Sequence, residues 1–97
     1  MNEPKAVSVR VLDREYTVGV GTGEVDGLMA AARLLDTRMR EVRGANRMAA
    51  IDRVAVLAAL NLAHELDQLK RENEQRDRQI MRTLASLQAR IHALLDV

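Results

Sequence analysis

Residues 54–66 read Val-Ala-Val-Leu-Ala-Ala-Leu-Asn-Leu-Ala-His-Glu-Leu, and this stretch decides the fold. Apart from Asn61, its first ten residues would be apolar on every side of a helix, which predicts burial on all sides. Because no Gly or Pro follows Gly44, one helix is expected to run from the segment 47–51 to about Leu95. At 1.5 Å per residue this helix would be on the order of 70 Å long, too long for the core of one small domain. We therefore expect its second half to pair with helices of other copies.

The second half of this helix carries an apolar stripe with heptad-like spacing. The stripe consists of Leu62, Leu66, Leu69, Ile80, Leu84, Leu87, Ile91 and Leu94. The four-residue step from Ile80 to Leu84 is a stutter, which locally relaxes a supercoil. Asn73 and Arg76 interrupt the stripe with polar side chains. Parallel pairing through Asn73 and antiparallel pairing of the tails both stay open.

Upstream, alternating apolar residues predict a β-hairpin. The alternation runs from Val7 to Val11, places Leu12 on the opposite face, and resumes over residues 16–20 after a polar link at 13–15. The turn type stays open because the link contains no Asn-Gly or Asp-Gly. A two-stranded hairpin alone is marginal in water, so its apolar face needs a cover.

Between the hairpin and the long helix, apolar residues recur at spacings of three and four and predict an amphipathic helix. This stripe contains Leu28, Ala31, Ala32, Leu35, Met39 and Val42. Thr22 or Gly23 is expected to cap its start, and Gly44 is expected to end it in the left-handed conformation. Met29, Met39 and Met48 are interpreted as gap-fillers in the core.

Together these elements predict an α+β fold that is mainly α. It contains an N-terminal β-hairpin, one short amphipathic helix and one long helix whose C-terminal half forms a coiled coil. Residues 1–66 are expected to form a globular head that dimerises, and residues 67–97 a coiled-coil tail that forms tetramers.

Composition narrows the function classes. The chain of 97 residues has one aromatic residue and no cysteine, so its core is thin, it has no disulfide, and oligomerisation is expected. The net charge of +1 implies no bulk attraction to nucleic acid or membrane. Residues 1–6 do not resemble a signal sequence, and the apolar stretch 54–63 is too short to cross a bilayer, which predicts a cytosolic protein.

The sequence offers no set of residues for catalysis. His64 and His92 are far apart on one helix, and neither has a cysteine or a serine close by in the chain. The glycines at 19–23 lack the spacing and the lysine of phosphate-binding loops. We therefore expect no enzyme activity, no cofactor and no metal site.

A local excess of positive charge is the most suggestive surface feature. Five arginines, set against Asp36 and Glu41, give an excess of three charges over this segment: Arg33, Arg38, Arg40, Arg43 and Arg47. Such a run is commonly only a solvated helix face. Its functional interpretation is a docking surface for an acidic partner.

Three segments of the chain resemble the ZapA family of bacterial cell-division proteins. They are Val9-Arg-Val-Leu-Asp-Arg-Glu-Tyr-Thr-Val18, Asn46-Arg-Met-Ala-Ala-Ile-Asp-Arg53 and Ala58-Ala-Leu-Asn-Leu-Ala-His-Glu-Leu66. The resemblance implies heads that dimerise through the start of the long helix, and antiparallel tails that join two dimers into a tetramer. It further implies binding and bundling of FtsZ filaments at the mid-cell division ring, support of that ring, and lower FtsZ GTPase activity.

The resemblance also implies roles for individual residues. The residues expected to bind FtsZ are Arg47, Arg43, Asp52 and Arg14. The residues expected in the dimer interface are Val54, Leu57, Leu60 and Asn61, and those expected in the tetramer interface are Leu84, Leu87, Ile91 and Leu94. Two alternative functions remain: a coiled-coil adaptor for another cytoskeletal or division partner, and a dimeric DNA-binding protein. The second is disfavoured because Gly44 and an apolar helix separate the arginines from the coiled coil, unlike the continuous helix of basic zippers.

Overall fold

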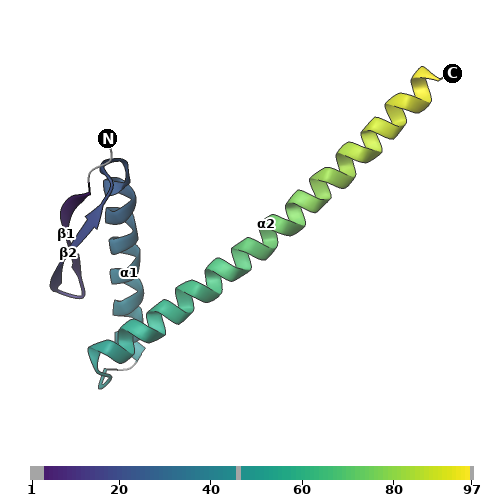
Figure 1. Ribbon diagram of the computed structural model, residues 1–97. Helices are drawn as coiled ribbons and strands as arrows, with labels where there is room; N and C mark the ends of the chain where they lie inside the picture. Colours follow the sequence, from purple (N-terminus) through teal and green to yellow (C-terminus); the bar gives the residue numbers. More distant parts are fainter. Residues whose placement is uncertain (1–3, 46, 97) are drawn as a thin grey trace. The chain divides into compact units, whose positions relative to one another are not determined.

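The computed structural model describes residues 4–45 and 47–96 (Figure 1). Two strands, β1 (Lys5–Val11) and β2 (Arg14–Val20), precede a short 3-10 turn, η1 (Thr22–Glu24), and two helices, α1 (Val25–Ala45) and α2 (Ile51–Leu95). The predicted α+β, mainly α fold, with a hairpin followed by a shorter and a longer helix, is confirmed. The chain divides into two compact units, Met1–Asn61 and Leu62–Val97. The predicted division after residue 66 concerns assembly and stays a prediction.

The hairpin closes through a turn of only two residues. Strands β1 and β2 are antiparallel, and the last pair is Val11 with Arg14. Leu12 and Asp13 both have positive φ, 50° and 65°, as type I′ turns require, and such turns match the twist of the strands they join. The predicted polar link at 13–15 is therefore wrong in extent, because Arg14 already belongs to β2. Leu12 is also not on the outer face, since the turn directs its side chain into the core, where it is 6% exposed.

The core of the first unit is small and aliphatic. Its buried members come from the hairpin, α1 and the first turns of α2: Val9, Val11, Leu12, Ala32, Met39, Val54 and Ala58. The hairpin lies along α1 (Figure 1), and β1 makes the sheet's contacts with that helix. The predicted alternation of β1 and the predicted stripe of α1 therefore meet at one interface, which supplies the cover that a lone hairpin needs.

The helix ends differ from the expected ones. Gly44 lies inside α1, which continues to Ala45, and no described glycine has positive φ, so the predicted left-handed stop at Gly44 is wrong. Glycine permits that conformation but does not impose it. The expected caps Thr22 and Gly23 lie within η1, which is preceded by Gly21 without a side-chain capping bond. Only η1 thus separates the hairpin from α1.

The second unit consists of α2 alone from Leu62 onward. Every described residue from 66 to 96 is exposed, including the apolar ones. Within residues 4–45 and 47–96, no helix combines the length and the apolar character needed to span a bilayer.

Candidate functional site

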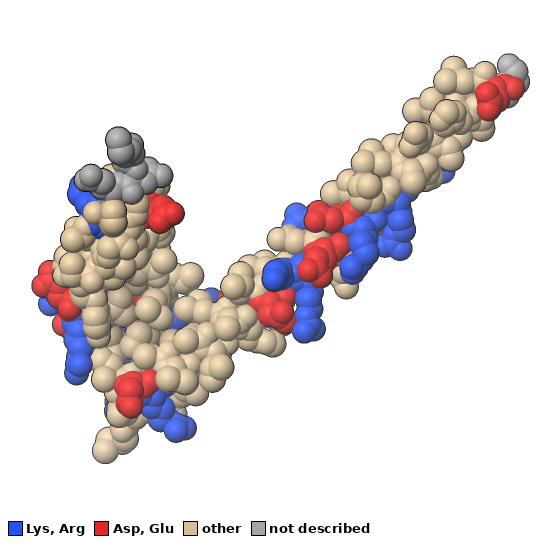
Figure 2. All heavy atoms as spheres, in the orientation of Figure 1, with Lys and Arg blue, Asp and Glu red and all other residues tan. Residues whose placement is uncertain are grey.

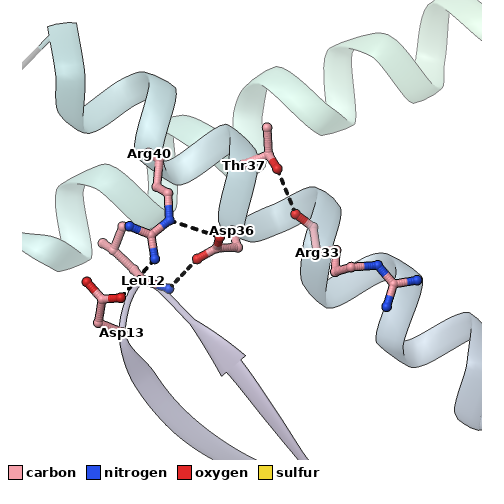
Figure 3. Close-up of polar contacts among 6 residues, drawn as sticks. All are labelled: Leu12, Asp13, Arg33, Asp36, Thr37 and Arg40. Carbon is pink, nitrogen blue, oxygen red and sulfur yellow. Dashed lines mark hydrogen bonds and ion pairs between the residues drawn. The ribbon is translucent and has the colours of Figure 1, made fainter.

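A carboxylate on α1 holds the hairpin turn in place (Figure 3). The Leu12 N–H donates to Asp36 Oδ1 at 2.7 Å, and Arg40 Nε donates to Asp36 Oδ2 at 2.9 Å. Arg40 Nη2 also pairs with Asp13 Oδ1 at 2.9 Å. Asp36 and Arg40 thus contact both residues of the turn, so the turn lies against the C-terminal half of α1. We call these four residues the turn clamp.

The contacts of the turn clamp favour the charged forms of its ionisable side chains, Asp13, Asp36 and Arg40. The hydrogen bond from Arg40 lowers the pKa of Asp36, and the backbone N–H of Leu12 lowers it further. The pKa of Asp13 is also lowered, chiefly by the hydrogen bond from Arg40, with smaller contributions from the charges of Arg43 and Arg10. The two carboxylates in turn raise the pKa of Arg40. The positive charge of Arg43 thus also favours the ionised form of Asp13 in the turn.

The four residues expected at the FtsZ surface lie in four different places in the first unit. Arg14 begins β2, Arg43 is in the last turn of α1, Arg47 is in the α1–α2 connection, and Asp52 is in the first turn of α2. Arg14 directly follows the turn residue Asp13, and the charge of Arg43 contributes to the lowered pKa of Asp13.

Asp52 differs from the three arginines in having a local role. Its Oδ1 accepts a hydrogen bond from the N–H of Arg53 at 2.9 Å. N–H groups in the first turn of a helix have no partner within the helix, and a carboxylate there also opposes the positive end of the helix dipole. This bond gives Asp52 a structural task at the start of α2, beside any task in binding.

The basic run is smaller than the sequence suggests, since two of its members interact within the chain. Arg40 belongs to the turn clamp, and Arg38 also has an interaction inside the molecule. Arg43 and Arg47 are exposed and form no ion pair with any described residue, and Arg53, which sequence reasoning missed, joins them. Its spacing after Arg47 was visible, but only the short connection brings the two side chains together.

Met48 is the second residue that sequence reasoning missed. Interpreted from the sequence as a core gap-filler, it is instead 98% exposed in the α1–α2 connection. A shallow hollow of about 440 Å³ is lined by Arg47, Met48, Ala49 and Arg53. The interpretation was wrong because Met48 precedes α2 and is not on the apolar face of either helix.

The expected dimerisation residues separate into two groups. Val54 is 1% exposed and packs within the core of its own chain. Leu57 is half-buried, while Leu60 and Asn61 are exposed. These last three, with Glu41, Val42 and Ala45 of α1, line a depression of about 510 Å³. Leu57, Leu60 and Asn61 are therefore accessible to a partner, whereas Val54 is buried in the core of its own chain.

A second opening in the first unit is almost wholly apolar. It lies between the hairpin and α1 and has a volume of about 450 Å³. Its lining includes Tyr16 and Val18 from β2, Leu28 and Leu35 from α1, and Ala55 from α2. Tyr16 is exposed and Val18 is half-buried, so the apolar side of the hairpin is only partly covered. We call this opening the hairpin groove.

The second unit presents its apolar stripe to solvent. The expected tetramerisation residues Leu84, Leu87, Ile91 and Leu94 are all exposed, Leu84 by 55%. In the polar interruption, Arg76 donates to Asn73 Oδ1 on the same helix, and Arg71 pairs with Asp67 at 3.0 Å nearby. Figure 2 shows charged side chains crowded along the first part of this unit and few near its end. We call the stripe from Leu62 to Leu94 the tail seam.

Known proteins resemble this chain along most of its length. The family model described as Cell division protein ZapA matches residues 7–91. A Pseudomonas aeruginosa protein named Cell division protein ZapA is 36% identical over 96 residues, covering 99% of this chain and 86% of that protein.

Two solved structures share the fold. One is described as an unknown conserved bacterial protein from Pseudomonas aeruginosa PAO1; it has a TM-score of 0.65 and 37% identity, with 94% of this chain and 92% of that chain covered. The other, a ZapA mutant dimer from Geobacillus stearothermophilus, has a TM-score of 0.65 and 26% identity, with 82% and 92% covered. Since the family model spans the hairpin, α1 and most of α2, this chain belongs to the ZapA family of cell division proteins.

Proposed function

We propose that this protein is a self-associating, non-enzymatic scaffold that binds FtsZ filaments and cross-links them at the mid-cell division ring. The observation that carries the proposal is the tail seam, an apolar stripe about nine helical turns long whose described residues are all exposed from Leu66 onward. Exposed apolar surface of that extent marks an interaction site. A lower FtsZ GTPase activity would follow from altered filament assembly and would require no chemistry here.

The first unit supports dimerisation. The hairpin groove and the depression at Leu57, Leu60 and Asn61 are both open to solvent. On α2, the side chains of Leu60 and Val56 are exposed. Two copies could bury these surfaces against each other, as the description of the Geobacillus relative as a dimer suggests. A small aliphatic core gains most from such burial, because apolar area removed from water stabilises at about 25 cal/mol per Å².

The charge distribution of the second unit supports antiparallel tails. Residues 65–77 contain five acidic and three basic side chains, a net charge of −2, whereas residues 78–96 contain three basic and one acidic, a net charge of +2. Antiparallel pairing places the acidic segment of one tail beside the basic segment of another. Parallel pairing would place like charges together. Charge thus favours the orientation that puts heads at both ends of the assembly.

Heads at both ends allow one assembly to contact two filaments. Once one head is bound, the other meets its filament at a high effective concentration, so weak single contacts suffice. Arg47, with Arg43 and Arg14, is the proposed contact to FtsZ, because a guanidinium can bind a carboxylate through two parallel hydrogen bonds. Asp52 contributes by fixing the start of α2 next to Arg47.

The test is co-sedimentation of the purified protein with FtsZ and GTP, with light scattering on the same sample. We expect more pelleted FtsZ and a rise in scattering for the native protein. Arg47→Ala should lower both by severalfold while helicity and sedimentation mass stay unchanged. Arg78→Ala is the matched control, because this exposed arginine of the second unit lies outside the tail seam.

The outcomes separate the two parts of the proposal. No pelleting by a correctly assembled native protein would reject FtsZ as the partner and leave the self-association standing. Equal losses for Arg47→Ala and Arg78→Ala would instead point to a general charge effect and would remove Arg47 from the contact.

A further inference from the structure

We infer that Met48 is the apolar anchor of the FtsZ-binding surface and inserts into a hydrophobic pocket of FtsZ whose rim carries carboxylates. The inference rests on the proposed function and adds a residue that the resemblance does not supply. The starting observation is the 98% exposure of Met48, compared with 4% for Met39 in the core. An unbranched thioether is adaptable and suits a protein-binding surface.

The surroundings of Met48 have the arrangement of a binding hot spot. Arg47 and Arg53 line the same hollow as Met48, so two basic residues and one long apolar side chain share this surface. Neither arginine forms an ion pair with any described residue, and the neighbouring carboxylate of Asp52 is hydrogen-bonded to the backbone of Arg53. Interfaces concentrate their energy in an apolar or aromatic centre, and a polar rim excludes water around it.

Charge complementarity defines the partner surface. Two cations beside one apolar side chain are matched by an apolar pocket edged with aspartate or glutamate. In a second copy of this chain, the lining of the hairpin groove contains no acidic residue, and the depression at Leu57, Leu60 and Asn61 contains one, Glu41. One carboxylate leaves the second guanidinium beside Met48 without a partner, so a second copy matches this surface less well.

Other classes of partner fit less well. The net charge of +1 gives the chain no bulk attraction to nucleic acid, and two of the five arginines in the basic run interact within the chain. A lipid surface would call for an amphipathic helix with a continuous apolar face, and the short connection at 47–50 provides a single side chain.

The position in the chain is also suited to docking. Met48 lies in the connection between α1 and α2, three residues before α2 begins at Ile51. Short connections held between rigid elements are common binding sites. Its removal should leave the core intact, because none of the buried core residues lies in the connection.

The experiment compares full-length variants by co-sedimentation with FtsZ polymerised in GTP, read as the protein concentration that gives half-maximal pelleting. Met48→Ala should raise this concentration about tenfold, a loss typical of a hot-spot side chain. Met48→Leu keeps an apolar side chain of similar size and should stay within about twofold of the native value. Arg53→Ala should also weaken binding. Met81→Ala, at an exposed methionine of the second unit, is the control and should change nothing.

Each remaining outcome decides against the inference in a distinct way. If the native protein binds FtsZ and Met48→Ala binds equally well, the inference is overturned while the proposed function stands. If the native protein fails to bind, the proposed function fails first. Met48-dependent flotation with vesicles of phosphatidylserine and phosphatidylcholine, in the absence of FtsZ, would overturn the assignment to a protein pocket. Circular dichroism and sedimentation mass, unchanged in every variant, would show that binding alone is affected.

Discussion

At the scale of single residues, the turn clamp explains how an unfavourable turn persists. The left-handed conformation costs roughly 1–2 kcal/mol for a residue that carries a Cβ, and leucine tolerates it worse than asparagine or glycine. Burial of the Leu12 side chain contributes about 1.5–3 kcal/mol, which is similar in size to that cost. The Leu12 N–H then has a partner in Asp36, so the turn leaves this backbone donor satisfied.

This turn also shows where prediction from sequence stopped. Alternation identified the hairpin, because its strands follow a local pattern. It could not identify the turn residues, because Leu12 and Asp13 are not the usual residues of a type I′ turn and their partner Asp36 lies 24 residues further along the chain. The same limit applies to Met48, whose exposure depends on where α2 begins. Local patterns therefore predicted the strands, whereas contacts between residues far apart in the chain could not be predicted.

The clamp predicts a pH dependence of stability. Because folding lowers the pKa of Asp36 and Asp13, their contribution to stability is complete above the usual pKa of aspartate and is lost as the pH falls through the lowered, folded-state pKa. The midpoint of thermal unfolding should therefore be level near neutral pH and fall below about pH 4. Fluorescence of Tyr16, the only aromatic residue, would report unfolding of the first unit alone.

Asp36→Asn tests whether the clamp causes that fall. The amide oxygen can still accept the Leu12 N–H, but it has no charge for Arg40, so the midpoint at neutral pH should drop by a few degrees and its decline in acid should flatten. Glu41→Gln, one turn further along α1, is the control and should keep the native acid decline. An unaltered pH profile for Asp36→Asn would exclude the clamp as its source.

At the scale of elements, the two helices differ in how well sequence defined them. The absence of Gly and Pro after Gly44 set the extent of α2 within a few residues of the observed Ile51–Leu95. The end of α1 was missed, because a glycine in its last turn simply stayed helical. Helix length follows from a long uninterrupted pattern, whereas a helix end depends on a few competing backbone hydrogen bonds.

The start of α2 is accordingly open to improvement. Its first helical hydrogen bond runs from Val54 N to Ala50 O at 3.0 Å, which places alanine, a poor capping residue, at the N-cap. Ala50→Ser should stabilise the first unit by about 0.5–1 kcal/mol, because the hydroxyl can accept an otherwise unpaired N–H in the first turn. Urea unfolding followed by Tyr16 fluorescence measures the change.

Ala59→Ser is the matched control for this capping prediction. It makes the same substitution at an exposed position inside α2, where serine is a weaker helix former than alanine, and should destabilise slightly. Equal effects at positions 50 and 59 would contradict a capping role for Ala50.

At the scale of the whole molecule, the sequence predicts which surfaces are apolar more reliably than it predicts which chain buries them. The periodicity of the tail seam is visible in the sequence, and in the structure its residues from Leu66 onward are exposed. Val54 shows the limit, because an apolar residue expected at the dimer surface instead fills the core of its own chain. Periodicity identifies a buried face but does not say which chain buries it.

Leu84→Glu tests the assembly itself. In the proposed tetramer this side chain, 55% exposed in the single chain, is buried between tails, and an unpaired carboxylate there would have to be desolvated. Sedimentation equilibrium should show the mass fall from four chains to two, with the head dimer retained. Ala85→Glu places the same charge on the neighbouring residue, about 100° around the helix and away from the seam, and should remain tetrameric.

Because the dimer would keep its FtsZ contacts but carry heads at one end only, Leu84→Glu should still bind filaments and should bundle them far less. A tetrameric Leu84→Glu protein would show that the tails join by another face, and full bundling by the dimer would show that cross-linking does not depend on them.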